Sequence, residues 1–368
     1  MGRKNYGSSH ETFTVSAKRF DLSPFLSRYR DHKTVFGISA NRFYPLSTEN
    51  DPTEAYWNLK KNVMLYDVPE KPLEISGRDA TKLLEKIFTR TIRDLKINRA
   101  RYAIACDYNG GIFMDGVLIR LGKNKFWYIH ANGDFETWLL AHTKGLHVNI
   151  RDPKSWAIQI QGPNSLKVLQ KLFKSELANL KYYYFMNYRD LIISNTGYTG
   201  CGGYEIYCKN EDVVGLWNNI FEAGSDFDIK PIGLAARDTL RLEMGFCLYG
   251  NELNDEISPI EAGLSWITKT NKIFTSSSLF KRQKEVGVNK KLIGFEMLEK
   301  AIPRNGYTIF SIDKKKIGIV TSGTMSPSLK KGIGLGYVKS HFSNLNDKIF
   351  IEIRGNMKQA LIVKTPFK

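Results

Sequence analysis

The chain has 368 residues, of which 42% are hydrophobic, and its formal net charge at pH 7 is +17. This length and apolar content predict two or three domains with substantial cores, and they argue against a largely disordered protein. No run approaches the roughly 18 uninterrupted apolar residues that cross a bilayer, and residues 1–12 lack the apolar segment of a signal peptide. We therefore expect a loose N-terminal tail, no membrane and a cytoplasmic location.

The positive charge and the cysteines do not by themselves indicate a site. The lysines are spread along the whole chain, which is typical of a general surface bias, and no basic stripe interleaved with aromatics predicts a nucleic-acid interface. The histidines form no HExxH motif and the cysteines form no CxxC pair, so we expect no metal site and reduced thiols. The four cysteines are Cys106, Cys201, Cys208 and Cys247.

Two segments that lie 85 residues apart share one pattern, in residues 73–88 (LEISGRDATKLLEKIF) and 158–173 (IQIQGPNSLKVLQKLF). Each alternates apolar and polar residues like a half-buried strand, turns at a glycine and then spaces apolar residues along one helix face. A weaker pair, 126–142 and 204–221, runs from an aromatic-rich strand into a helix that carries a tryptophan. The duplication predicts two related α+β modules.

From about residue 281 the pattern changes to short β-prone stretches. KLIGFEM, YTIFSI, KIGIVTS, IGLGYV, KIFIEI and QALIVK are separated by Gly, Asn, Asp and Lys turns. This pattern predicts an all-β C-terminal domain, either a barrel or a jelly-roll-like sheet.

Two predicted strands carry a carboxylate among apolar or aromatic residues. Asp115 interrupts the apolar strand FMDGVLIRL after an Asn-Gly-Gly turn, and a carboxylate there is costly unless it is paired, hydrogen-bonded or solvated. A functional role and an exposed edge position are equally compatible with this pattern. Glu205 lies between aromatics in YEIY and could accept hydrogen bonds from the N–H edge of a flat heterocycle. The alternating pattern of this strand, taken alone, favours a solvent-facing position for Glu205.

A predicted helix, ARDTLRLEMGF, carries Arg237 and Arg241 four residues apart. Such a pair is typical of a solvated or salt-bridged face, but arginine geometry also suits a clamp on a carboxylate. The glycine-rich segment 195–207 precedes it and contains no GK[ST], so a nucleotide-phosphate loop is not predicted.

Together, and in this order, five segments resemble signatures of the glycine cleavage T-protein family. The resemblance implies an α+β fold in which three domains form a ring around a central folate. The matching segments are 197–206 (GYTGCGGYEI), 233–253 (GLAARDTLRLEMGFCLYGNEL), 258–269 (SPIEAGLSWITK), 302–310 (IPRNGYTIF) and 317–338 (IGIVTSGTMSPSLKKGIGLGYV). The expected division is a first module of 1–70 and 156–253, a second of 71–155 and 254–280, and a C-terminal β-barrel of 281–368.

The resemblance also implies roles for single residues. The family's catalytic aspartate, which follows the Gly-Gly turn, matches Asp115. The residues matched to the family's folate-binding positions are Tyr102, Val117, Tyr198, Glu205 and Arg237.

The resemblance implies a tetrahydrofolate-dependent one-carbon transfer of the aminomethyltransferase type. The small donor would be held by a lipoyl carrier called the H-protein, and the enzyme would align it with N5 of tetrahydrofolate. The segment 64–75 (MLYDVPEKPLEI) and Cys201 depart from the T-protein pattern. A second hypothesis follows from segments that look closer to dimethylsulfoniopropionate demethylase and to folate-dependent O-demethylases, which are 23–29, 55–68 and 202–207. A third hypothesis is a non-catalytic folate-binding scaffold in tRNA modification or iron–sulfur maintenance.

Overall fold

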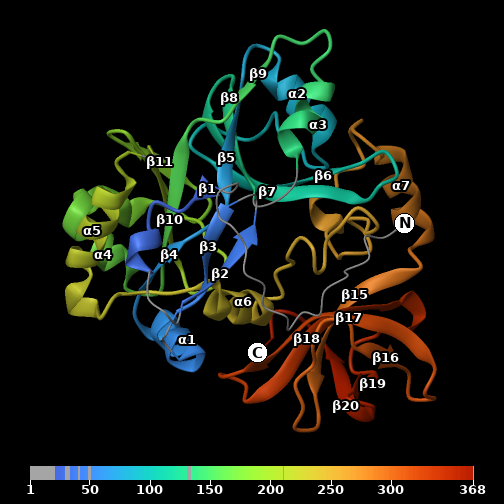
Figure 1. The fold of residues 1–368 in the computed structure, drawn as a ribbon. Helices are drawn as coiled ribbons and strands as arrows, with labels where there is room; N and C mark the ends of the chain where they lie inside the picture. The colour runs from blue at the N-terminus through green and yellow to red at the C-terminus, as the bar shows by residue number, and fades with distance from the viewer. Residues whose placement is uncertain are drawn as a thin grey trace.

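The structure is a computed structural model, and it describes residues 21–29, 34–39, 42–48, 51–130, 134–209 and 211–367. The loose tail predicted for residues 1–12 lies outside these ranges. Two open sheets with their helices and a C-terminal barrel form three lobes, and helix α6 (Leu234–Glu243) lies between the first sheet and the barrel (Figure 1).

The first large sheet has six strands in the order β11-β12-β13-β10-β4-β14. Alternate side chains of the fully buried strand β10 point to opposite faces, so Ile158 packs with α4 and α5 while Ala157 packs toward the second sheet. The elements are β4 (Met64–Asp67), β10 (Ser155–Gln161), α4 (Ser165–Phe173), β11 (Phe185–Tyr188), β12 (Leu191–Ser194), β13 (Gly203–Lys209), α5 (Val213–Ala223) and β14 (Lys230–Pro231).

The second sheet has five strands in the order β6-β7-β8-β5-β9. One face is covered by α2 and α3, and its other face packs against the first sheet through residues such as Ile119 and Ile129. The ring of Trp127 meets the ring of Tyr207 from the first sheet, with centroids 6.2 Å apart. The elements are β5 (Lys71–Ser76), α2 (Ala80–Ile87), β6 (Ala100–Cys106), β7 (Ile112–Gly122), β8 (Lys125–His130), α3 (Phe135–Ala141) and β9 (Asn149–Arg151).

The predicted duplication is confirmed in the backbone. Strand β5 leads through Gly77 into α2, and β10 leads through Gly162 into α4. Both glycines adopt φ of +121°, and a Cβ there would meet a backbone carbonyl oxygen, His147 O at 2.3 Å or Asn62 O at 2.5 Å. Each turn therefore requires glycine for the same two reasons, conformation and close approach.

The C-terminal lobe is a closed barrel in the order β15-β18-β17-β16-β19-β20, which confirms the barrel rather than the jelly roll. Strand β18 is buried at every position from Gly332 to Val338, because one face lines the barrel core and the other is covered by α6 and the segment after it. The strands are β15 (Lys290–Met297), β16 (Thr308–Phe310), β17 (Lys316–Ser326), β18 (Lys331–Lys339), β19 (Lys348–Ile353) and β20 (Asn356–Val363).

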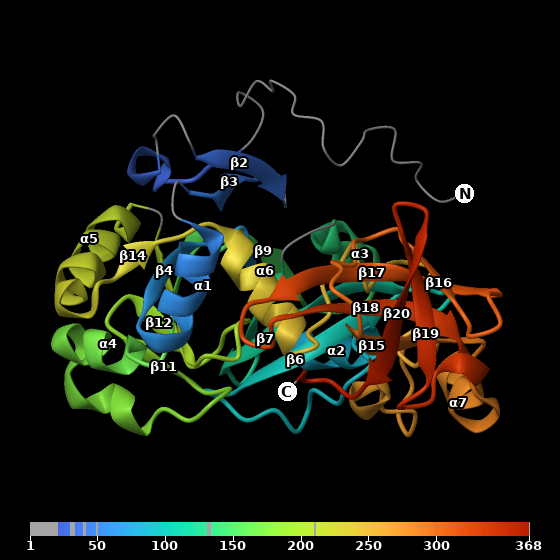
Figure 2. The ribbon, with the colours of Figure 1, turned by 90° about the horizontal axis from the view of Figure 1, so that it is seen from below.

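The remaining elements surround the two sheets. Helix α1 (Pro52–Lys61) begins where the Asp51 carboxylate accepts a hydrogen bond from Thr53 N at 2.8 Å, with proline at the first helical position. Figure 2 shows β2 (Val35–Ser39) and β3 (Arg42–Ser47) as a separate layer beside α1 and α6. Strand β1 (Asp21–Leu22) pairs with β3, and α7 (Ser277–Val286) precedes the barrel.

Buried charges join α6 to the barrel. Arg241 is fully buried, and its guanidinium donates to Glu252 Oε2 at 2.8 Å and to Ser322 Oγ on β17 at 3.0 Å. Glu252 also accepts hydrogen bonds from Thr321 and Ser322. This network fixes α6, and with it the other arginine of the helix. The boundaries of the three expected domains remain a prediction, although the barrel strands begin at Lys290.

Candidate active site

Asp115 lies on β7, which is flanked by β6 and β8 and so is not an edge strand. Asp115 and Val117 are two residues apart and share the face of β7 that is directed at the first sheet. Tyr102 on β6 stands opposite Val117, and its hydroxyl donates a hydrogen bond to Asp115 Oδ2 at 2.9 Å. One β-hairpin thus brings together three of the predicted site residues.

The surroundings of Asp115 favour its protonated form. Burial raises the pKa of Asp115 to about 6, the hydrogen bond from Tyr102 opposes the rise, and the negative charge of Glu70 adds to it. Near neutral pH this carboxyl can therefore exchange a proton more readily than an ordinary aspartate.

Glu205 on β13 faces the same space from the first sheet. Gln159 Nε2 and Thr196 Oγ1 donate short hydrogen bonds to its two oxygens, and the Tyr207 hydroxyl donates at 3.2 Å. Burial raises the pKa of Glu205, while the hydrogen bonds from Thr196 and Gln159 oppose the rise. The side chain is half-buried and held by three donors, so it is not the solvent-facing residue that its local sequence favours.

Arg237 and Tyr198 complete the group. Arg237 is only 8% exposed, its Nη2 donates to Glu70 Oε1 in an ion pair, and its Cζ lies 5.0 Å from the ring centroid of Tyr198. The Tyr198 hydroxyl donates to Cys247 O. Burial lowers the pKa of Arg237, but the carboxylate of Glu70 together with Tyr198 and Glu205 outweighs burial, and the net shift is upward. The arginines of α6 are therefore not a solvated face.

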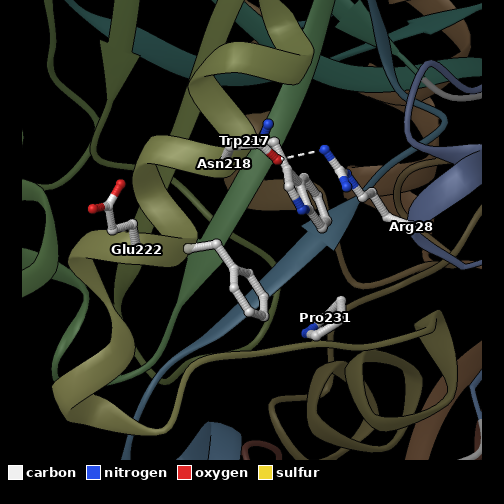
Figure 3. A pocket seen from close by; sticks show the side chains of 6 residues that line it. Arg28, Trp217, Asn218, Glu222 and Pro231 are labelled. Carbon is white, nitrogen blue, oxygen red and sulfur yellow. Dashed lines mark hydrogen bonds between the residues drawn. The ribbon is translucent and has the colours of Figure 1, made fainter.

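Five of the six predicted site residues thus lie on two sheets and one helix that face one another, and Tyr198 lies in the loop between β12 and β13. A further residue, Glu70, acts on two of them, because the negative charge of its carboxylate raises the pKa of both Asp115 and Glu205. Two surface pockets lie elsewhere. One, of about 420 Å³, is lined by residues that include Arg28 and Trp217 (Figure 3), and another, of about 260 Å³, lies between α6 and the barrel.

Sequence reasoning missed two residues of the group. Glu70 occupies the connection between β4 and β5, and its Oε2 is buried without a hydrogen-bond partner among the residues that the structure describes. Gln159 is 1% exposed, and its Oε1 is likewise unpaired within the described ranges. Gln159 carried one sequence signal, because it lies between Ile158 and Ile160, and a glutamine that is buried beside apolar neighbours needs a polar partner. Glu70 also carried a signal, because it is a charged residue in VPEKP (68–72), which lies in the segment that departs from the T-protein pattern.

Comparisons with known proteins identify the family of this chain. Residues 33–272 match the family model described as the GCVT N-terminal domain, and residues 290–368 match the glycine cleavage T-protein C-terminal barrel domain. The chain belongs to the glycine cleavage T-protein family. The aminomethyltransferase of Flavobacterium psychrophilum is 47% identical to this T-protein family member over 303 residues, which cover 80% of this chain and 84% of the relative.

Two further relatives of this T-protein family member bear on its fold. The aminomethyltransferase of Phocaeicola vulgatus is 44% identical over 305 residues, which cover 80% of this chain and 84% of the relative. The crystal structure of glycine cleavage system aminomethyltransferase T from Bartonella henselae superposes with a TM-score of 0.88 at 25% identity, covering 95% of this chain and 98% of the other. These likenesses confirm the predicted T-protein-like fold with its C-terminal barrel.

Other predicted properties concern metals, thiols and membranes. Within the described ranges no group of His, Cys, Asp and Glu is placed to hold a metal ion, and all four cysteines are free. In the part of the chain that the structure describes, no helix is both long and apolar enough to cross a membrane.

Proposed function

We propose that this chain is a tetrahydrofolate-dependent aminomethyltransferase, with Asp115 as its catalytic carboxylate. The observation that supports the proposal best is the Tyr102–Asp115 pair, which faces Glu205 and Arg237 across two sheets of a T-protein fold. Relatives that are 47% and 44% identical to it are named aminomethyltransferase.

The unpaired atoms of the group fit a folate. Arg237 Nε is a buried donor, and Gln159 Oε1 and Glu70 Oε2 are buried acceptors, all without partners among the described residues. Buried polar atoms are nearly always paired in proteins, so a ligand that offers both N–H and C=O groups along a flat edge would satisfy them. A pterin ring has such an edge.

Each residue then has a physical task. Tetrahydrofolate, when bound, supplies the nitrogen N5 that accepts the one-carbon unit. Tyr102 holds one oxygen of Asp115, which leaves Oδ1 to take a proton or to stabilise positive charge at the reacting centre. Glu205, fixed by three donors, would receive N–H groups of the heterocycle, and Val117 would pack on its face. The chain needs no nucleophile of its own because alignment of two bound reactants can supply much of the rate.

The donor is proposed to be an aminomethyl group on a lipoyl carrier protein, as in the glycine cleavage reaction. A small methylated donor is the alternative, with 5-methyl-tetrahydrofolate as the product, and a non-catalytic folate-binding scaffold is the third hypothesis.

Single-turnover product analysis separates these hypotheses. The purified chain with tetrahydrofolate is offered aminomethyl-lipoyl carrier in one reaction and a panel of methylated sulfonium, amine and aryl-ether donors in another. We expect 5,10-methylene-tetrahydrofolate from the first reaction and none with Asp115→Asn. Methyl-tetrahydrofolate from the second reaction alone would establish a demethylase, and folate binding without either product would establish the scaffold.

A further inference from the structure

The arginine of the site forms its ion pair with a residue outside the family signatures. Three carboxylates, from Glu70, Glu205 and Asp115, lie around Arg237 and Tyr198, and Glu70 takes the ion pair. Within the described ranges Glu205 receives its hydrogen bonds from the neutral donors Gln159, Thr196 and Tyr207. The described partner of Asp115 is the neutral Tyr102 hydroxyl.

We propose that Glu70 is a positioning residue of this site, which holds Arg237 over the ring of Tyr198 and keeps the guanidinium from pairing with Glu205 or Asp115. Without a counter-ion, a buried guanidinium would move to the nearest remaining carboxylate, since an unpaired buried charge is strongly destabilising. Either choice would block a group that the ligand needs. This inference deepens the proposed function and rests on it for the identity of the ligand.

The backbone places Glu70 rigidly enough for this task. It lies directly before β5 and three residues after the end of β4, so strands of both large sheets fix its position. Pro69 precedes Glu70 directly and Pro72 follows it by two residues, and a proline ring fixes the backbone φ at its own position. A counter-ion on this short connection is less free to move than one on a surface loop.

The pair is also incomplete in a way that suits a ligand. A bidentate pair would use two N–H groups and both carboxylate oxygens, but here Nη2 and Oε1 make the contact. Arg237 Nε and Glu70 Oε2 stay buried and unpaired in the part of the chain that is described. One donor and one acceptor therefore remain for an amide-like edge, which has an N–H beside a C=O.

The charge of Glu70 acts on its neighbours as well. The groups that face it are Arg237 on α6, Asp115 on β7, Glu205 and Tyr207 on β13, and Asp67 on β4. Removing the negative charge would make ionisation of Asp115 and Glu205 easier, so the pKa of each would fall. Glu70→Gln should therefore move the acid limb of the pH–rate profile to lower pH, whereas a purely structural role would leave its position unchanged.

A double-mutant cycle tests the inference by calorimetry with tetrahydrofolate. Arg237→Ala should raise the dissociation constant about tenfold or more, and Glu70→Ala should raise it by a similar factor. The double variant should bind no worse than Arg237→Ala alone, because Glu70 acts through Arg237. The matched control is Glu54→Ala, which removes an exposed ion pair with Lys230 and should leave the dissociation constant unchanged.

Two results would overturn the inference: a dissociation constant within twofold of wild type for Glu70→Ala, or losses that multiply in the double variant. Failure of the wild type to bind tetrahydrofolate would instead contradict the proposed function. In that case the same four proteins are compared by urea unfolding without ligand. Non-additive midpoints for Glu70→Ala and Arg237→Ala would support the positioning role, and additive midpoints would refute it.

Discussion

Asp115→Asn should raise the free energy of unfolding of the protein without bound folate at pH 8, and the same substitution should abolish turnover. In the folded state, ionising Asp115 is unfavourable because burial raises its pKa from the ordinary 3.8 to about 6. A folded pKa above the unfolded one contributes stability that is complete below about pH 4 and is lost as the pH rises through about 6. Asparagine never ionises, so the variant escapes that loss.

The magnitude follows from the two pKa values. The rise corresponds to about 3 kcal/mol once both states are ionised, at about 1.4 kcal/mol for a tenfold change. Asp115 is half-buried and its charge is partly screened by water, so we expect about 1–3 kcal/mol at pH 8. The same linkage gives about half of that difference at pH 5.

Urea unfolding at pH 5 and pH 8 measures this difference. The control is Asp190→Asn, on the exposed turn between β11 and β12, which should show no such dependence on pH. A stability difference between Asp115→Asn and wild type that does not change with pH, or a variant less stable than wild type at pH 8, would refute the reasoning.

Three further predictions concern other parts of the chain. Tyr102→Phe removes the hydrogen bond that favours the ionised form of Asp115, so the acid limb of the pH–rate profile should move up by about 0.5–1 pH unit if Asp115 has the proposed role. Glu252→Ala leaves the buried guanidinium of Arg241 with the carboxylate of Asp238, whose side chain is 56% exposed, as its counter-ion, and should cost about 3 kcal/mol in urea unfolding. Gly162→Ala, at φ +121°, should lower the free energy of unfolding by about 2 kcal/mol or more. Gly215→Ala in α5, where a Cβ would meet no atom within 4 Å, should raise it by about 0.5–1 kcal/mol, and equal effects of the two substitutions would contradict this reasoning.

Patterns of local sequence predicted the secondary structure well. The strand-turn-helix units at β5 and β10 follow from period-two alternation, a glycine and period-3.6 spacing, all of which are local properties. The six barrel strands could be predicted for the same reason. Closure of the barrel could not be predicted from local patterns, because it depends on the pairing of β15 with β20, whose paired residues lie more than sixty positions apart in the sequence.

The site was only partly predictable because its members are joined across sheets. Asp115 was visible as a charge within an apolar strand, but its burial against the first sheet was not. The residues next to Glu205 favoured a solvent-facing position, because the donors that hold its carboxylate, Gln159 and Thr196, lie 46 and 9 residues away in the sequence. Glu70 was missed because its partner Arg237 is 167 residues distant.

A crystal structure of the complex with 5-formyl-tetrahydrofolate, a stable analogue, tests the central claim most directly. We expect the pterin ring to lie between β7 and β13, with hydrogen bonds to Asp115 or Glu205 and to the Glu70–Arg237 pair. A ring bound elsewhere, such as in the pocket beside Arg28 and Trp217, with Asp115 still contacted by Tyr102 alone, would contradict it.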